Sequence, residues 1–92
     1  MYKLILNGET IRTKKELFEC MGEQLELPAW FGKNLDALYD VITCDLLPKG
    51  TVEVRIGAVQ KLKENLGGYA DALLGMLGDI AEEDKRLTFT AE

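Results

Sequence analysis

Three short strand-like runs separated by longer helical stretches restrict the folds open to this chain of 92 residues. The clearest run is 51–56, where valine and isoleucine alternate with charged residues, as in a strand with one wetter face. Residues 2–6 and 87–91 are the other two runs, and Asn7-Gly8 ends the first as a turn. Strands separated by helices favour parallel pairing through right-handed crossovers. The sequence predicts one α/β domain, residues 1–92, with a small three-stranded parallel sheet packed with about four helices.

The helical stretches carry their own start and packing signals. Thr13 and Glu16 have the spacing of a capping box, which predicts a helix that begins at Lys14. Its core face is formed by Leu17, Phe18, Met21 and Leu25. A short helix is expected over 58–66, ending at Gly67-Gly68, and a longer one from Tyr69 to about Glu83. Tyr69, Leu73, Met76, Leu77 and Ile80 form its core stripe, and we expect Gly75 and Gly78 to permit close packing against a neighbour.

Residues 27–40 form an unusual segment, rich in aromatic residues, that is expected to begin as a loop and continue as a helix. Pro28 opposes a helix through its own position, and Gly32 permits backbone angles suited to a turn. Asn34 is a good N-cap, so a helix is predicted from Leu35 to Thr43 or Cys44, followed by a loop over 45–50. Its inward face is formed by Leu35, Leu38, Val41 and Ile42.

Asp36 and Asp40 lie nearly opposite that apolar face, one turn apart, with Tyr39 at the border. Two like charges at this spacing cost a helix a few tenths of a kcal/mol. The simplest interpretation is a solvated acidic face. Trp30 and Phe31 precede it in a short loop, where at least one ring is expected to face solvent. An exposed aromatic ring beside paired carboxylates indicates a binding surface.

Composition restricts the class of partner. The chain carries 11 basic and 16 acidic residues, a net charge of −5. Binding to nucleic acid is disfavoured, since phosphate contacts need clustered lysine and arginine. An acidic protein is instead steered toward basic partners.

Targeting and redox signals favour the cytoplasm. The N-terminal segment MYKLIL is too short for a signal peptide, and no apolar run approaches the ~20 residues that span a bilayer. Cys20 and Cys44 form no CxxC motif, and we expect both to be free thiols. No membrane partner is expected.

Most catalytic chemistry has no candidate residues. The sequence contains no histidine and no serine, which removes the commonest general base, the commonest transition-metal ligand and any Ser-His-Asp triad. Asp36 and Asp40 could serve as an acid/base pair or hold a hard cation, although no motif supports either role. We expect no enzyme, cofactor, metal site or small-molecule substrate.

The run LxLPxxFGxNLDALYD resembles the barstar family of intracellular ribonuclease inhibitors, in which a similar segment plugs a nuclease active site. Trp30 and Tyr39 keep aromatic residues where the family has them. The matching residues are Leu25, Leu27, Pro28, Gly32, Asn34, Leu35, Asp36, Ala37, Leu38 and Asp40.

The resemblance implies a barstar-like fold and a basic extracellular-type ribonuclease as partner, inhibited inside the producing cell as an antitoxin or immunity protein. In this interpretation Asp40 mimics a substrate phosphate and Asp36 pairs with a neighbouring basic group. Trp30 and Tyr39 pack on the rim, while Gly32 and Asn34 shape the loop. Asp79, on the last long helix, aligns with a second acidic contact of the family.

Two departures from the family pattern suggest a different nuclease partner. Asp45 replaces an aromatic residue of the best-known member, and Lys33 is basic where that member is acidic. Two alternatives remain open at this point. One is a non-inhibitory protein-binding module of the same fold, and the other is a metal-dependent enzyme that uses the aspartates.

Overall fold

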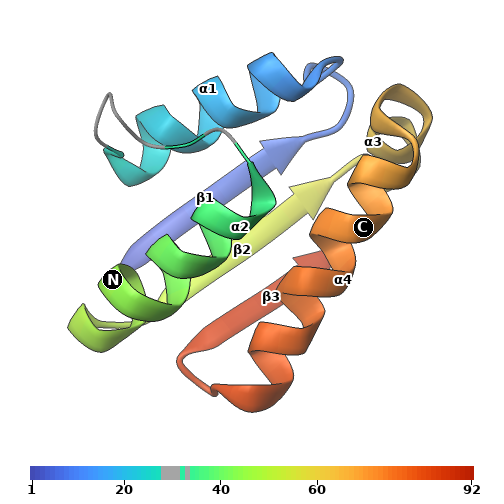
Figure 1. Ribbon diagram of the computed structural model, residues 1–92. Coiled ribbons are helices and arrows are strands. Elements are labelled where there is room, and N and C mark those ends of the chain that lie inside the picture. The colour runs from blue at the N-terminus through green and yellow to red at the C-terminus, as the bar shows by residue number, and fades with distance from the viewer. Residues whose placement is uncertain (28–31, 33) are drawn as a thin grey trace.

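The computed structural model describes residues 1–27, 32 and 34–92. Its elements follow the predicted alternation of strands and helices (Figure 1). In chain order they are β1 (Tyr2–Asn7), α1 (Lys14–Leu25), α2 (Leu35–Asp40), the π-helical segment η1 (Val41–Leu46), the 3₁₀ turn η2 (Leu47–Lys49), β2 (Val52–Gly57), α3 (Val59–Leu66), α4 (Gly68–Glu83) and β3 (Leu87–Ala91). The predicted α/β class, with three parallel strands and four helices in the described part of the chain, is confirmed.

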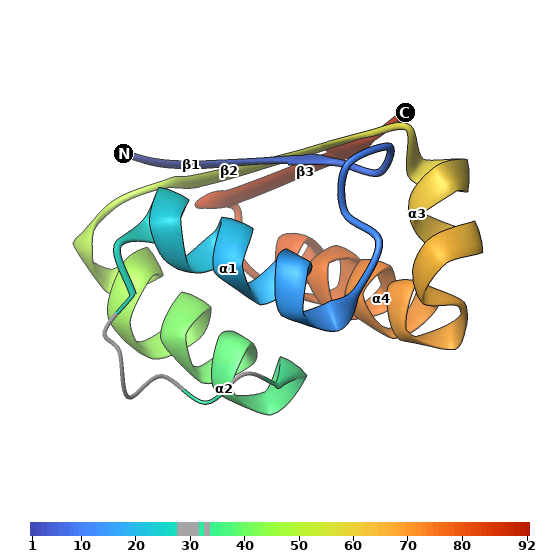
Figure 2. The same ribbon diagram turned by 90° about the horizontal axis from the view of Figure 1, so that it is seen from above.

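The sheet explains where the helices lie. Its order is β1-β2-β3, and both pairs of neighbours are parallel, with Leu4 beside Val54 and Val54 beside Phe89. Each connection must therefore cross from one end of the sheet to the other. Because the strand order advances in one direction and crossovers share one hand, the connections fall on one face. Figure 2 shows the helices on one side of the sheet, with the other side uncovered.

The core lies between the sheet and the helices. The inward side chains of the central strand β2, Val52, Val54 and Ile56, are buried. The sheet adds Leu4, Leu6 and Leu87, and the helices add Leu17, Phe18, Met21, Leu25, Leu38, Ile42, Leu62, Leu73, Leu77 and Ile80. This confirms the predicted inward faces of α1 and α2. In the α4 stripe, Tyr69 and Met76 are only partly buried.

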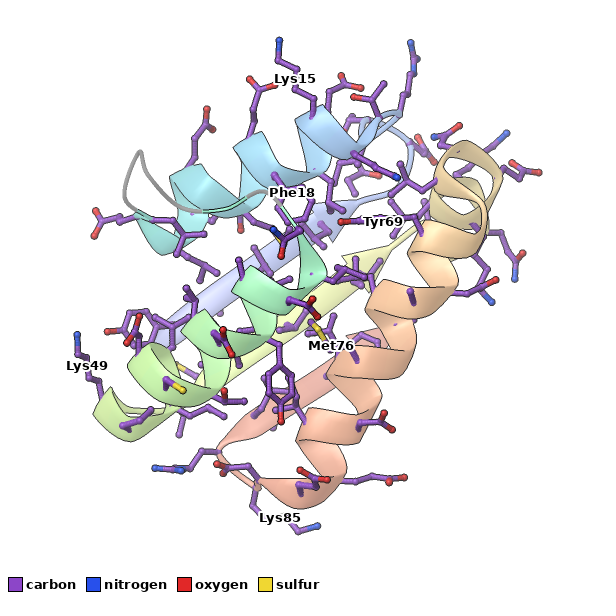
Figure 3. All side chains as sticks on the ribbon, viewed as in Figure 1. Lys15, Phe18, Lys49, Tyr69, Met76 and Lys85 are labelled. Carbon is purple, nitrogen blue, oxygen red and sulfur yellow. The ribbon has the colours of Figure 1, made fainter. Side chains whose placement is uncertain are left out.

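Phe18 and Tyr69 join α1 to α4. Their rings meet edge to face with centroids 6.3 Å apart (Figure 3). The Lys14 ammonium lies 4.4 Å from the centre of the Tyr69 ring, a cation–π contact. Tyr69 is thus held on the flank of α4 that faces α1.

The start of α1 is capped as predicted. The Thr13 hydroxyl accepts from the Glu16 N–H at 3.1 Å. The Glu16 carboxylate in turn accepts from the Arg12 N–H at 3.1 Å. Two N–H groups at the helix entry are therefore paired, one residue earlier on the return side than in the usual box.

A side-chain amide covers the outer edge of β1. Gln24 of α1 accepts from the Ile5 N–H and donates to the Ile5 C=O, both at 2.7 Å. The same amide donates to the Cys20 Sγ at 3.0 Å. Gln24 thus takes the place of a neighbouring strand at Ile5.

Two expectations for the chain after Asn34 are wrong. The α-helix ends at Asp40 rather than at Thr43 or Cys44, and 45–50 is helical as far as Lys49. The Leu47 N–H bonds to the Ile42 C=O, the i→i+5 pattern of a π-helix. Ile42, Leu46 and Leu47 are all buried, so apolar packing continues the helix past the point where Pro48 and Gly50 were expected to end it.

Gly75 and Gly78 do not permit close packing within this chain. A Cβ built at either residue meets nothing within 4 Å among the described residues. Cys20 and Cys44 are free thiols. None of the helices in the described ranges is both long and apolar enough to cross a membrane.

Leu38 anchors α2 in the core and is fully buried. Leu38→Ala should lower the free energy of unfolding by about 2–5 kcal/mol through loss of transfer energy and a residual cavity. Ile5→Ala is the control, because Ile5 lies on the uncovered face at 51% exposure and should cost below about 1 kcal/mol. Denaturant titration measures both. Equal losses would contradict the assignment of the buried face.

Asp84 and Arg86 shape the turn between α4 and β3. The Asp84 carboxylate accepts from the Arg86 N–H at 2.9 Å and from its guanidinium at 2.7 and 3.0 Å. These bonds favour the charged carboxylate and lower the pKa of Asp84 to about 2. Its stabilising contribution should be complete above the ordinary value of 3.8 and be lost as the pH falls toward 2. An NMR titration of Asp84 checks this, and Arg86→Ala should return the midpoint toward 3.8; an unchanged midpoint would contradict the assigned cause.

Candidate functional site

Asn34 begins the acidic helix as predicted. Its backbone is extended, with φ −149° and ψ 166°, and its side-chain oxygen accepts from the Ala37 N–H at 2.8 Å. The Asn34 N–H donates to the Gly32 C=O at 2.9 Å. The start of α2 therefore depends on the geometry of these two residues.

Gly32 is needed for space rather than for an unusual backbone angle. It is absent from the described residues with positive φ, so that part of the expectation is wrong. A Cβ at Gly32 would lie 3.3 Å from the Asn34 Nδ2 and 3.4 Å from the Ala37 Cβ. A larger residue would press on the cap of α2.

Asp36, Tyr39 and Asp40 are exposed on α2, while Leu38 faces the core. Tyr39 is 42% exposed, one of the few large apolar side chains in the described ranges with this much surface in solvent. Neither carboxylate forms an ion pair with a described basic group. The helix thus presents two available negative charges beside an aromatic ring, a combination suited to a cationic protein surface.

The π-helical segment η1 follows this surface directly, and sequence analysis missed it. The Thr43 hydroxyl donates to the Tyr39 C=O at 2.8 Å, so the exposed ring and η1 are joined. Cys44 and Asp45 are exposed. Single π turns occur often at functional sites. The consecutive apolar pair Leu46-Leu47 was the available signal, since both residues are buried only if the helix continues to them.

Asp79 is exposed on α4, one turn after Met76. Figures 1 and 2 show α2 and α4 on the same side of the sheet, and Figure 3 shows Met76 pointing from α4 toward α2. Asp79 lies near that flank of α4 by helical spacing. Its membership of the site stays a prediction. Trp30, the other aromatic residue of the predicted site, lies outside the described residues.

A metal site is not assembled by the described residues. No three of their histidine, cysteine, aspartate and glutamate side chains gather in positions that could hold an ion. Asp36 and Asp40 therefore remain a pair of solvent-facing carboxylates on one helix.

Comparison with known proteins agrees with this geometry. The family model described as "Barstar (barnase inhibitor)" matches residues 1–92. A protein of Bacillus subtilis (strain 168) named "Putative ribonuclease inhibitor YrdF" is 33% identical over 89 residues, which cover 92% of this chain and 91% of that protein. The match extends beyond the segment around α2 to both terminal strands, so the chain belongs to the barstar family.

Proposed function

We propose that this protein binds and inhibits a basic ribonuclease of the secreted type, within the cytoplasm of the cell that makes it. The observation that carries the proposal is the surface of α2, where Asp36 and Asp40 stand unpaired beside the exposed Tyr39. Membership of the barstar family and the name of the Bacillus relative support a role as ribonuclease inhibitor. The protein acts by occupying the nuclease rather than by catalysis.

In the proposed complex the two carboxylates take the place of substrate phosphates. Asp40 meets the cationic groups of the nuclease active site, and Asp36 pairs with a neighbouring basic residue. Tyr39 and Trp30 pack at the rim, and Gly32 and Asn34 hold the start of the helix in place. Asp79 adds a second acidic contact from α4. The net charge of −5 accelerates the encounter with a basic partner at low ionic strength.

The site is rigid where it matters for this role. Leu38 and Ile42 fix α2 and η1 to the core, and the Asn34 cap fixes the entry. A carboxylate on such a support loses little freedom on binding, which favours affinity. The same rigid surface would also suit a non-inhibitory binding module, so the activity of the nuclease has to be measured as well as binding.

Asp40→Asn tests the role of the charge at nearly constant side-chain size. Removing the charge leaves nuclease cations buried and unpaired, at a cost of about 2–5 kcal/mol in binding. This corresponds to a dissociation constant raised about 30-fold to several thousand-fold. The free energy of unfolding should change by no more than about 0.5 kcal/mol, since Asp40 is exposed. A panel of small basic secreted ribonucleases supplies the partner, with binding and RNA cleavage measured together.

Glu64→Gln is the matched control. It removes one negative charge from an exposed residue of α3, at the end of the sheet away from α2 (Figure 2). Binding by this variant should stay within a few-fold of the wild type. Equal inhibition by Asp40→Asn and the wild type would exclude Asp40 from the site. Binding of a nuclease without loss of RNA cleavage would favour the non-inhibitory module.

A further inference from the structure

The two edges of the sheet are treated differently. At the β1 edge, Gln24 pairs with both main-chain groups of Ile5. At the β3 edge, the N–H and C=O groups of Phe89 and Ala91 have no hydrogen-bond partner among the described residues. Unpaired strand edges are a template for another strand, and proteins usually protect them.

The direction of these groups follows from their neighbours. The Arg86 C=O accepts from Val52, and the Glu92 N–H donates to the Ile56 C=O, both in β2. Residues 86, 88, 90 and 92 therefore point their main-chain groups toward β2, and Leu87, Phe89 and Ala91 point theirs away. The Leu87 N–H is already paired with the Asp84 C=O at 3.2 Å, but its C=O has no described partner.

Nothing in the strand itself guards this edge. Leu87–Ala91 contains no charged residue and no proline, and its threonine and phenylalanine favour strands. Figure 1 shows β3 as the outer strand opposite β1, and Figure 2 shows α4 on the helix side of the sheet rather than in line with it. The edge is therefore open to a strand in the plane of the sheet.

We propose that this edge binds a second copy of the chain, with β3 antiparallel to β3 and Phe89 opposite Phe89 on a two-fold axis. This pairing gives two hydrogen bonds between the Phe89 residues and one from each Ala91 N–H to the Leu87 C=O of the other copy. Thr88 faces Thr90 across the interface. The result is a continuous sheet with β1 at both outer edges, where Gln24 closes it.

Charge selects both this register and a second copy as the occupant. With Phe89 opposite Phe89, Arg86 of each copy lies opposite Glu92 of the other, so opposite charges meet at both ends. The bonds of Arg86 to Asp84 use its Nε and one Nη, which leaves further N–H groups for Glu92. A register shifted by two residues places Glu92 opposite Asp84 or Thr88 and loses both pairs.

The flank of α4 beside this edge allows the second copy to approach. Tyr69 and Met76 mark the flank that faces α1 and α2 (Figure 3). By helical spacing, Leu74, Gly78 and Ala81 lie on the other flank. Gly78 has no atom within 4 Å of an ideal Cβ, so this glycine has no role in packing its own chain. In the dimer the two copies of α4 meet on the same side of the joined sheet, where a glycine permits close contact.

Gly78→Gln tests the proposal without disturbing the monomer, because the added side chain has room and favours a helix. Sedimentation equilibrium at about 0.15 M salt, which screens the like net charges, should show wild type approaching twice 10.3 kDa as concentration rises toward 1 mM. Gly78→Gln should stay monomeric. Gly22→Gln is the matched control, since Gly22 is also helical with nothing within 4 Å but lies on α1.

Glu92→Arg and hydrogen exchange test the register. Glu92→Arg places like charges opposite Arg86 and should raise the dimer dissociation constant about five- to tenfold. Protection of the Phe89 and Ala91 amides should rise with concentration, while the Ile5 amide, bonded to Gln24, should not change. A wild type that stays monomeric to 1 mM, or a dimer unaffected by both Gly78→Gln and Glu92→Arg, would overturn the proposal.

Discussion

The parallel pairing of β2 with both neighbours is the constraint on which the rest of the structure depends. Because parallel strands cannot be joined by a tight turn, each connection must carry the chain back along the sheet. The order β1-β2-β3 sends both connections over the same face, where Val52, Val54 and Ile56 bury the apolar sides of the helices. The other face keeps Lys3, Glu53 and Arg55 in solvent or near it. One decision of topology thus sets the core, the wet face and the layer from which α2 projects.

The acidic surface of α2 depends on this layer for its aim. Leu38 and Ile42, one turn apart, attach the helix to the core and turn Asp36 and Asp40 outward. Neither carboxylate has a basic partner in the described part of the chain, so their charge is left for an external group. In a stable protein of this size an unused pair of like charges on one helix costs little, which is why such a surface can be retained for binding.

Local signals predicted much of the fold and the start of the site. The alternation in β2, the Thr13–Glu16 cap and the Asn34 cap each involve residues within a few positions, and the structure confirms them. The bond between Gln24 and Ile5 joins residues 19 apart, and no local pattern reports it. The π turn also escaped, because it depends on burying Ile42, Leu46 and Leu47 together rather than on a backbone preference. The role of Gly32 was misassigned for a similar reason, since its neighbours come from the folded cap.

The π turn gives this chain a way to vary its binding surface by length as well as by substitution. An i→i+5 turn holds one residue more than an α turn, so η1 resembles an α-helix that has accepted an insertion. Upstream of it lie Asp36, Tyr39 and Asp40, and downstream lie the buried Leu46 and Leu47. Loss of one residue from Val41–Leu46 would rotate one set against the other about the helix axis. Homologues with indels here would thus show different side chains to their partners while keeping the leucines that hold the fold.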